Sequence, residues 1–313
     1  MSGLVCAMLA PGTTGCGHLN ELAGSYAHTQ ERALAGVRRA STLALTLCRA
    51  NATQAYLQMR LGLGSGGNLA APPSWGTWYR TEPAEGSGSN AWSAYCNELD
   101  ATGLVFEDAV VVLGVYGEAM EALAEAKDFD ASGLDQVAAG ASTAIAALGA
   151  ASGVVSAAQS IGSPLASIAT FVADQVRKRE LEAFVTKADP IIQAMAAALR
   201  SYVDALETER LLAQQRCSVV LRAVDARRDQ SGTLSFGAEE ANTFELARTD
   251  TSEFGLTQTK LSQYSTALQQ LSSAHSALAQ AAKHTASAKE TASGVSKFAT
   301  VLRHLEQTRE WEE

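Results

Sequence analysis

The sequence predicts an all-α fold, an elongated antiparallel bundle of about five long helices. Alanine is abundant, aromatic residues make up 6% of the chain, and only six prolines occur. Alternating runs of β-branched residues, which would indicate strands, are few. With 47% hydrophobic and 18% charged residues the chain can bury a core of ordinary size, and long helices allow its 313 residues to form a single domain.

Helix boundaries are predicted from capping and turn residues. Asp189 and Pro190 suit the N-cap and the first position of a helix, where the missing N–H of proline costs nothing. A bend is expected at residues 162–164, Gly-Ser-Pro, and the turn-rich residues 229–255 are expected to separate the last two helices. In chain order the five expected helices span about 19–60, 90–127, 134–187, 189–228 and 256–310.

The last two of these helices each carry a narrow apolar seam. Its residues are spaced alternately three and four apart, as in coiled coils, which favours an elongated bundle over packing through wide faces. A helix over 256–310 would span roughly 80 Å. The seam positions are Ile192, Met195, Leu199, Tyr202 and Leu206 in the first of the two helices, and Leu261, Tyr264, Leu268, Leu271, His275 and Leu278 in the second.

No charged residue occurs within residues 136–173, the longest uncharged run in the chain. The part before the Gly-Ser-Pro bend is long enough to cross a bilayer core, which needs about 20 residues, but its many alanines make it a weak spanning segment. A helix that is apolar all round is also what the interior of a bundle requires. We expect buried core helices. The alternative is a membrane-active hairpin, in which Ile145, Val154 and Val155 are candidate membrane or partner contacts.

The N-terminal residues 1–16 carry no charge and contain a short apolar run followed by small residues and a cysteine. The motif Thr13-Thr14-Gly15-Cys16 resembles the lipobox of bacterial lipoproteins. This resemblance implies that residues 1–16 are a signal segment, that Cys16 becomes the first mature residue and carries the lipid, and that 17–313 form the helical-bundle domain. The alternative is a cytosolic N-terminus, disordered or packed.

Cysteine placement predicts one disulfide and one buried thiol. Cys48 lies late in one predicted helix and Cys96 near the start of the next, so antiparallel packing would bring the two sulfurs to the same end of the bundle. Cys217 falls on an apolar seam, where a buried and unreactive thiol is expected. None of the cysteines has the spacing of a zinc ligand pair.

The Gly/Pro/Ser-rich loop expected at 61–89 concentrates aromatic residues. It contains Trp75, Trp78 and Tyr79, and Trp92 follows just beyond it. Aromatic side chains on such a loop can contact a membrane interface or a partner protein. They can equally plug the open end of a bundle, which is the interpretation we favour.

The sequence offers no pattern that indicates catalysis, a metal site or a cofactor. The sequence has no Gly-x-Ser-x-Gly motif after a predicted strand, the motif that would indicate a nucleophilic serine, and it has no phosphate-binding loop. His275 has neither a carboxylate nor a second histidine three or four positions away. The net charge of −9 without a basic stripe argues against nucleic acid as a partner. We therefore expect a non-enzymatic protein.

These features predict a lipid-anchored bundle in the bacterial cell envelope, facing the periplasm or the outside. It would act as a binding or scaffold component. The lipid would attach it to the membrane, and an envelope protein is a possible partner. The alternative is a membrane-active protein that inserts residues 136–173. Long helices bracketing an apolar Gly/Ala-rich hairpin resemble, in architecture alone, the helical pore-forming toxins of bacteria.

Overall fold

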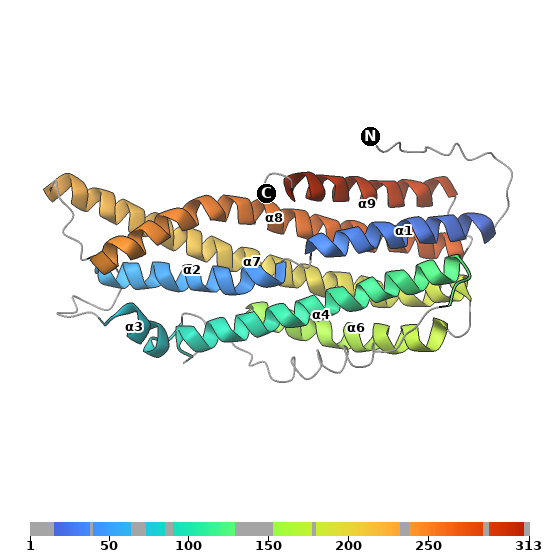
Figure 1. Cartoon of the computed structure of the whole chain (residues 1–313), viewed down its shortest axis with the longest axis horizontal. Coiled ribbons are helices and arrows are strands. Elements are labelled where there is room, and N and C mark those ends of the chain that lie inside the picture. Colours follow the sequence, from blue (N-terminus) through green and yellow to red (C-terminus); the bar gives the residue numbers. More distant parts are fainter. Residues whose placement is uncertain are drawn as a thin grey trace.

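The computed structural model describes residues 16–37, 40–63, 73–84, 90–128, 153–176, 180–231, 238–283 and 288–309. Of this part of the chain, 92% lies in eight helices and none in a strand, which confirms the predicted all-α class (Figure 1). The helices are α1 (Cys16–Val37), α2 (Ala40–Arg60), α3 (Trp75–Thr81), α4 (Trp92–Ala124), α6 (Gly153–Val176), α7 (Leu181–Ser231), α8 (Ala238–Ala282) and α9 (Ala288–Arg309).

The helices form an elongated bundle (Figure 1). The longest, α7, has 51 residues and would measure roughly 77 Å, and α8 runs back along it. Helices α1 and α2 follow one another along the rod, and α4 returns beside both of them. Helix α9 folds back over α8 and α1, and α6 packs against α4 and α7.

The two predicted seams are buried in the bundle, and α7 packs along α8. Every seam side chain is at most 6% exposed, and most are fully buried. The 3-4 spacing keeps these positions on one side of each helix. The partners of the seams are not confined to the other long helix, since Tyr202 stacks on Phe106 of α4 at 4.5 Å.

Two prolines that were expected to mark helix boundaries lie inside helices. Helix α6 runs through Pro164, so the predicted bend does not divide it, and α7 starts at Leu181 and continues through Pro190. The pyrrolidine ring removes one backbone hydrogen bond. Pro190 is exposed and Pro164 is partly exposed. Packing along the rest of each helix outweighs the loss.

Other boundaries also differ from the prediction. The single helix expected over 19–60 consists of α1 and α2, and α8 begins at Ala238, inside the stretch expected to be turns. The helix expected over 256–310 is the second part of α8 followed by α9. The two are held together by contacts such as the bond from Thr291 Oγ1 to the Ala277 carbonyl. The buried ring of Phe298 on α9 packs on Tyr26 of α1. No glycine or proline in the sequence marks this reversal.

One glycine allows α2 and α4 to approach closely. A Cβ atom at Gly103 in α4 would lie 2.6 Å from the backbone carbonyl oxygen of Ser41 in α2, a distance that requires the backbone to move. A Cβ at Gly114, further along α4, would meet nothing within 4 Å. The two positions make a matched pair on one helix.

We predict that Gly103→Ala lowers the free energy of unfolding by about 1–3 kcal/mol, because the added methyl group forces the helices apart. Gly114→Ala should leave it unchanged or raise it by up to about 1 kcal/mol, since alanine favours the helix. Urea unfolding followed by circular dichroism measures both variants. Equal stability of the two would contradict the close contact between α2 and α4.

Candidate functional site

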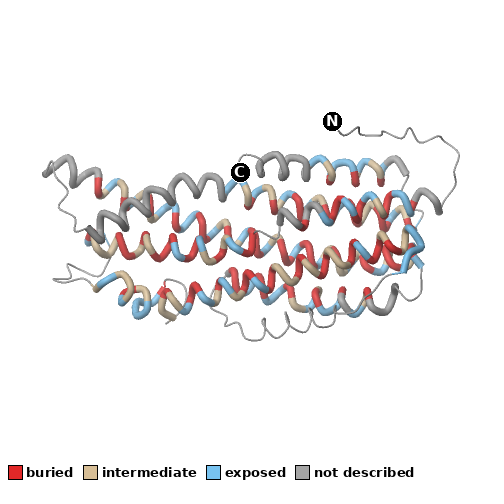
Figure 2. Tube along the Cα trace, in the orientation of Figure 1, coloured by how far each residue is buried: buried red, intermediate tan, exposed pale blue. Residues whose placement is uncertain are grey.

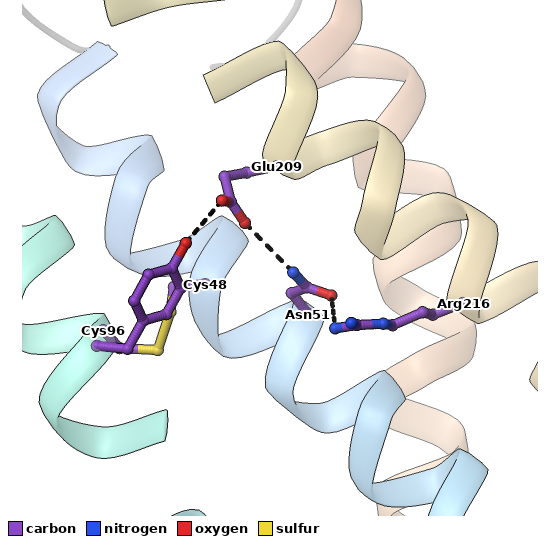
Figure 3. The surroundings of a disulfide bond; sticks show 6 residues. Cys48, Asn51, Cys96, Glu209 and Arg216 are labelled. Atoms are coloured by element: carbon purple, nitrogen blue, oxygen red, sulfur yellow. Dashed lines mark hydrogen bonds between the residues drawn. A yellow bond between two sulfur atoms is a disulfide. The ribbon is translucent and has the colours of Figure 1, made fainter. Parts of the chain in front are cut away.

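The predicted disulfide joins α2 to α4. Cys48 and Cys96 are bonded, with their Cα atoms 5.5 Å apart, and both residues are fully buried (Figure 3). The two cysteines are 48 positions apart in the sequence, so the bond closes a long loop. Cys217 in α7 is free and buried. The structure thus confirms the pairing and the burial of the third thiol.

A buried polar network surrounds the disulfide (Figure 3). Glu209 of α7, 9% exposed, accepts hydrogen bonds from Tyr95 Oη at 2.7 Å and from Asn51 Nδ2 at 3.3 Å. The Asn51 amide oxygen accepts a bond from Arg216 Nη1, and the guanidinium lies 5.6 Å from the ring centre of Trp92. Asn51 of α2 thus links the carboxylate to the cation. Hydrogen-bonding partners of this kind offset the free-energy cost of taking a charge out of water. Removal of one partner leaves that cost uncompensated and destabilises the fold.

A second buried network lies closer to the other end of the rod. Nε2 of the fully buried His275 in α8 lies 2.6 Å from Tyr116 Oη in α4, and its Nδ1 lies 3.0 Å from Asp189 Oδ1 in α7. Ser276 donates to Asp189, and Gln193 donates to the Ser272 carbonyl at 2.8 Å. The carboxylate of Asp189 can only accept, so Nδ1 of His275 carries the proton and donates to it. Nε2 then has no proton and accepts the hydrogen bond from the Tyr116 hydroxyl.

Burial and hydrogen bonding set the charge states in this second network. Burial lowers the pKa of His275, and the hydrogen bond to Asp189 opposes that shift only in part. Burial would raise the pKa of Asp189, but the hydrogen bond from His275, the electrostatic attraction to its ring, and hydrogen bonds from Gln193 and Ser276 together outweigh burial and lower the pKa. The stable arrangement at neutral pH is therefore a neutral imidazole beside an ionised carboxylate.

Spacing along the sequence could not reveal these partners. His275 is 86 positions from Asp189 and 159 from Tyr116, so no pattern within one helix connects them. Asp189 was expected to be the N-cap of a helix, but it lies within α7 and bonds to α8. Glu209 and Arg216 carried no signal beyond being charged residues on a long helix.

The aromatic residues of the predicted loop pack on the end of the bundle where α3 lies. Trp78 and Trp92 are 4% and 2% exposed and stack with ring centres 6.1 Å apart. Trp75 stacks between Trp78 and Tyr79 at 5.7 and 5.2 Å. Trp75 and Tyr79 are partly exposed. This geometry agrees with aromatic rings that close the bundle end, with only the outer pair accessible to a partner.

Helix α6 has one buried face and one face open to solvent (Figure 2). Val154 and Val155 are at most 1% exposed, so the two candidate contacts face the core; Ile145 lies outside the described residues. Within the described chain, Val154–Val172 is the one stretch long and apolar enough to span a membrane by length and composition, and 41% of it is buried. Among the described side chains of α6, the exposed ones carry no charge: Ser156, Gln159, Ser160, Ser163, Ala166, Ser167 and Thr170. The side chain of Asp174, near the end of α6, lies outside the described set.

The residues predicted to be functional lie in separate parts of the rod (Figure 1). Cys16 is the first residue of α1, at the end opposite α3, and its side chain lies outside the described set. In the described part of the chain no cluster of three or more His, Cys, Asp or Glu residues could hold a metal ion. Comparisons of the chain with protein-family models, with curated proteins and with solved structures found no match.

We predict that Cys48→Ala/Cys96→Ala lowers the free energy of unfolding by about 4 kcal/mol, because the unfolded chain regains the entropy of a loop of this length. Cys217→Ala is the control; it removes a thiol that closes no loop. Urea unfolding under non-reducing conditions compares the variants. A similar small loss in both would show that the bond contributes little to stability.

Proposed function

We propose that the protein is a lipid-anchored component of a bacterial cell envelope that acts by binding or scaffolding. The observation that carries the proposal is the buried Cys48–Cys96 disulfide. Disulfides form and persist in oxidising compartments and are rare in the reducing cytosol. A bond between two core helices, surrounded by a polar network, suits a protein that folds after export.

The position of Cys16 supports an anchor at one end of the rod. Helices α1 and α2, of 22 and 21 residues, follow one another from Cys16 towards α3, a path of roughly 65 Å. A lipid on Cys16 would hold that end at the membrane and project the α3 end outwards. The rod would then present its sides and its aromatic end to envelope partners.

The buried polar groups support binding rather than catalysis. His275 is fully buried and Glu209 is 9% exposed, and both are held by hydrogen bonds to neighbouring helices. Groups held in this way stabilise the register of the helices. They are not presented to a substrate at a cleft. Binding through the outer surface is therefore the activity that the geometry supports best.

Lipidation tests this proposal directly. Expressed in a bacterium with its natural upstream region, the protein should incorporate labelled palmitate and partition into the membrane fraction. Cys16→Ala should lose both properties, whereas Cys6→Ala, which leaves Cys16 intact, should retain them. Equal labelling of all three forms, or labelling of none, would refute the anchor.

A second candidate function, membrane activity, is favoured by the surface of α6. Over 154–172 this helix packs its apolar face on α4 and α7, and the described side chains that it exposes are uncharged. A helix that leaves the bundle in this form could place these residues in a bilayer without carrying a charge into the hydrocarbon, because the one acidic residue of α6, Asp174, lies beyond them. Residues 136–173 would then insert into the bilayer, which is the membrane-active alternative considered in the sequence analysis.

A charge on the exposed face of α6 separates the two functions. Ala166→Asp should alter the free energy of unfolding by no more than about 0.5 kcal/mol, because its carboxylate stays in water. In a bilayer the same group would cost about 3 kcal/mol. Dye release from phosphatidylethanolamine/phosphatidylglycerol vesicles should therefore fall in Ala166→Asp but not in Ser201→Asp, a matched change on exposed α7. If the unaltered protein releases no dye at any pH tested, membrane activity is excluded.

A further inference from the structure

A chain of aromatic contacts connects α6 to the buried histidine. The ring of Phe171 in α6 lies 5.3 Å from that of Phe184 in α7, which stacks at 5.1 Å and 7° on Tyr116 of α4. The hydroxyl of Tyr116 bonds to His275 in α8. The C-terminal part of α6 is thus linked, through Phe184, to a tyrosine that is hydrogen-bonded to the imidazole.

The described side chains that face His275 include one full negative charge. Its titratable neighbours are Asp189 from α7, Tyr116 from α4 and Tyr26 from α1, and the ring of Tyr26 meets the imidazole edge-on at 5.5 Å. From α9, the ring of Phe298 packs on Tyr26 and cannot titrate. Asp189 therefore supplies the one full charge among these groups, and it already accepts the Nδ1 proton.

Protonation of Nε2 changes the bond that positions Tyr116. In the neutral state Nε2 accepts the proton of the phenol. When Nε2 carries its own proton it can only donate, and the phenol O–H must find another acceptor. Tyr116 is fully buried, so water cannot serve as that acceptor unless the ring moves. Movement of Tyr116 disturbs its stack on Phe184 and, through it, the contact with Phe171.

We propose that His275 is an acid-sensitive latch for α6. When it is protonated, Tyr116 shifts, the Tyr116–Phe184–Phe171 stack opens, and the C-terminal part of α6 leaves the bundle. Its apolar face, which includes Ile161, Leu165, Ile168 and Val172, then becomes available to a lipid bilayer. The binding of lipid rests on the second candidate function, but the release of α6 does not.

The direction of the pH effect follows from burial. Because burial lowers the pKa of His275 in the folded state, the folded state binds a proton less readily than the unfolded state does. The stability that the neutral latch contributes is therefore complete above the unfolded pKa of about 6.5 and is lost as the pH falls below it. Asp189 stays ionised through this range, because its own pKa is lowered.

Hydrogen–deuterium exchange tests the latch without lipid. Between about pH 7.5 and about pH 5, after correction for intrinsic exchange, peptides of α6 should lose protection by about tenfold or more. Peptides of α2, held by the disulfide, should remain protected. His275→Gln, which cannot titrate, should abolish the pH dependence, and His28→Gln, an exposed histidine of α1, should behave like the unaltered protein.

Two results would overturn the latch. One is simultaneous loss of protection in α2 and α6, which indicates global acid unfolding. The other is a pH dependence of α6 that persists in His275→Gln. If that variant does not fold, histidine-ring NMR of the unaltered protein replaces it: the titration midpoint of His275 must coincide with the opening of α6, and a different midpoint excludes the latch.

A flotation assay with phosphatidylethanolamine/phosphatidylglycerol vesicles separates the latch from the membrane function. Opening of α6 at acid pH with vesicle binding only at acid pH supports both. Opening of α6 without vesicle binding retains the latch and refutes the membrane-active candidate. Vesicle binding that is equal at both pH values while α6 stays closed refutes the latch.

Discussion

The structure depends on the burial of one long helix, α7, along most of its length. It packs against α8, α6, α2 and α4. The seam residues from Ile192 to Leu206 are fully buried, and each large apolar side chain removed from water contributes roughly 1.5–3 kcal/mol. The continuity of these contacts explains why α7 tolerates Pro190 in its interior.

Apolar seams alone define the register of long helices poorly, because a shift by one heptad restores a similar contact. The two buried networks remove this ambiguity. Asp189 and Glu209 of α7 are twenty residues apart, so they hold the helix at two heights separated by roughly 30 Å. Asp189 bonds to α8, and Glu209 bonds to α2 and α4. A shifted register would leave the buried Glu209 carboxylate without its partners, at high cost, and would remove the bonds of the partly buried Asp189 to His275 and Ser276.

The proposed anchor and the proposed latch concern the same end of the rod. Leu19 of α1 and Leu181 of α7 line one cavity of about 370 Å³, so the first turn of α1 lies beside the start of α7, which follows the end of α6 by five positions. A lipid on Cys16 would therefore hold the C-terminal end of α6 close to the bilayer. Under this arrangement an acid-released α6 would meet lipid without diffusion of the protein, and the two functions are compatible.

The sequence by itself determined what depends on spacing within one segment. The all-α class, the seams of α7 and α8, the burial of Cys217 and the Cys48–Cys96 pair all follow from periodicity and from the order of neighbouring helices. Their physical basis is local, because a helix places residues three and four apart on one face. The reversal between α8 and α9, which contains no glycine or proline, lacked a signal of this kind.

Tertiary structure decided the properties that require partners distant in the sequence. Pro164 and Pro190 are turn signals locally, but packing over the whole of α6 and α7 outweighs one lost hydrogen bond in each. In the sequence, His275 occupies a position in the apolar seam. Its hydrogen bonds to Tyr116 of α4 and Asp189 of α7 form only when the helices assemble. The part of the uncharged run that the structure describes, from Gly153 onwards, lies in a helix with one buried face. Burial and pairing belong to the assembled helices, and no single segment encodes them.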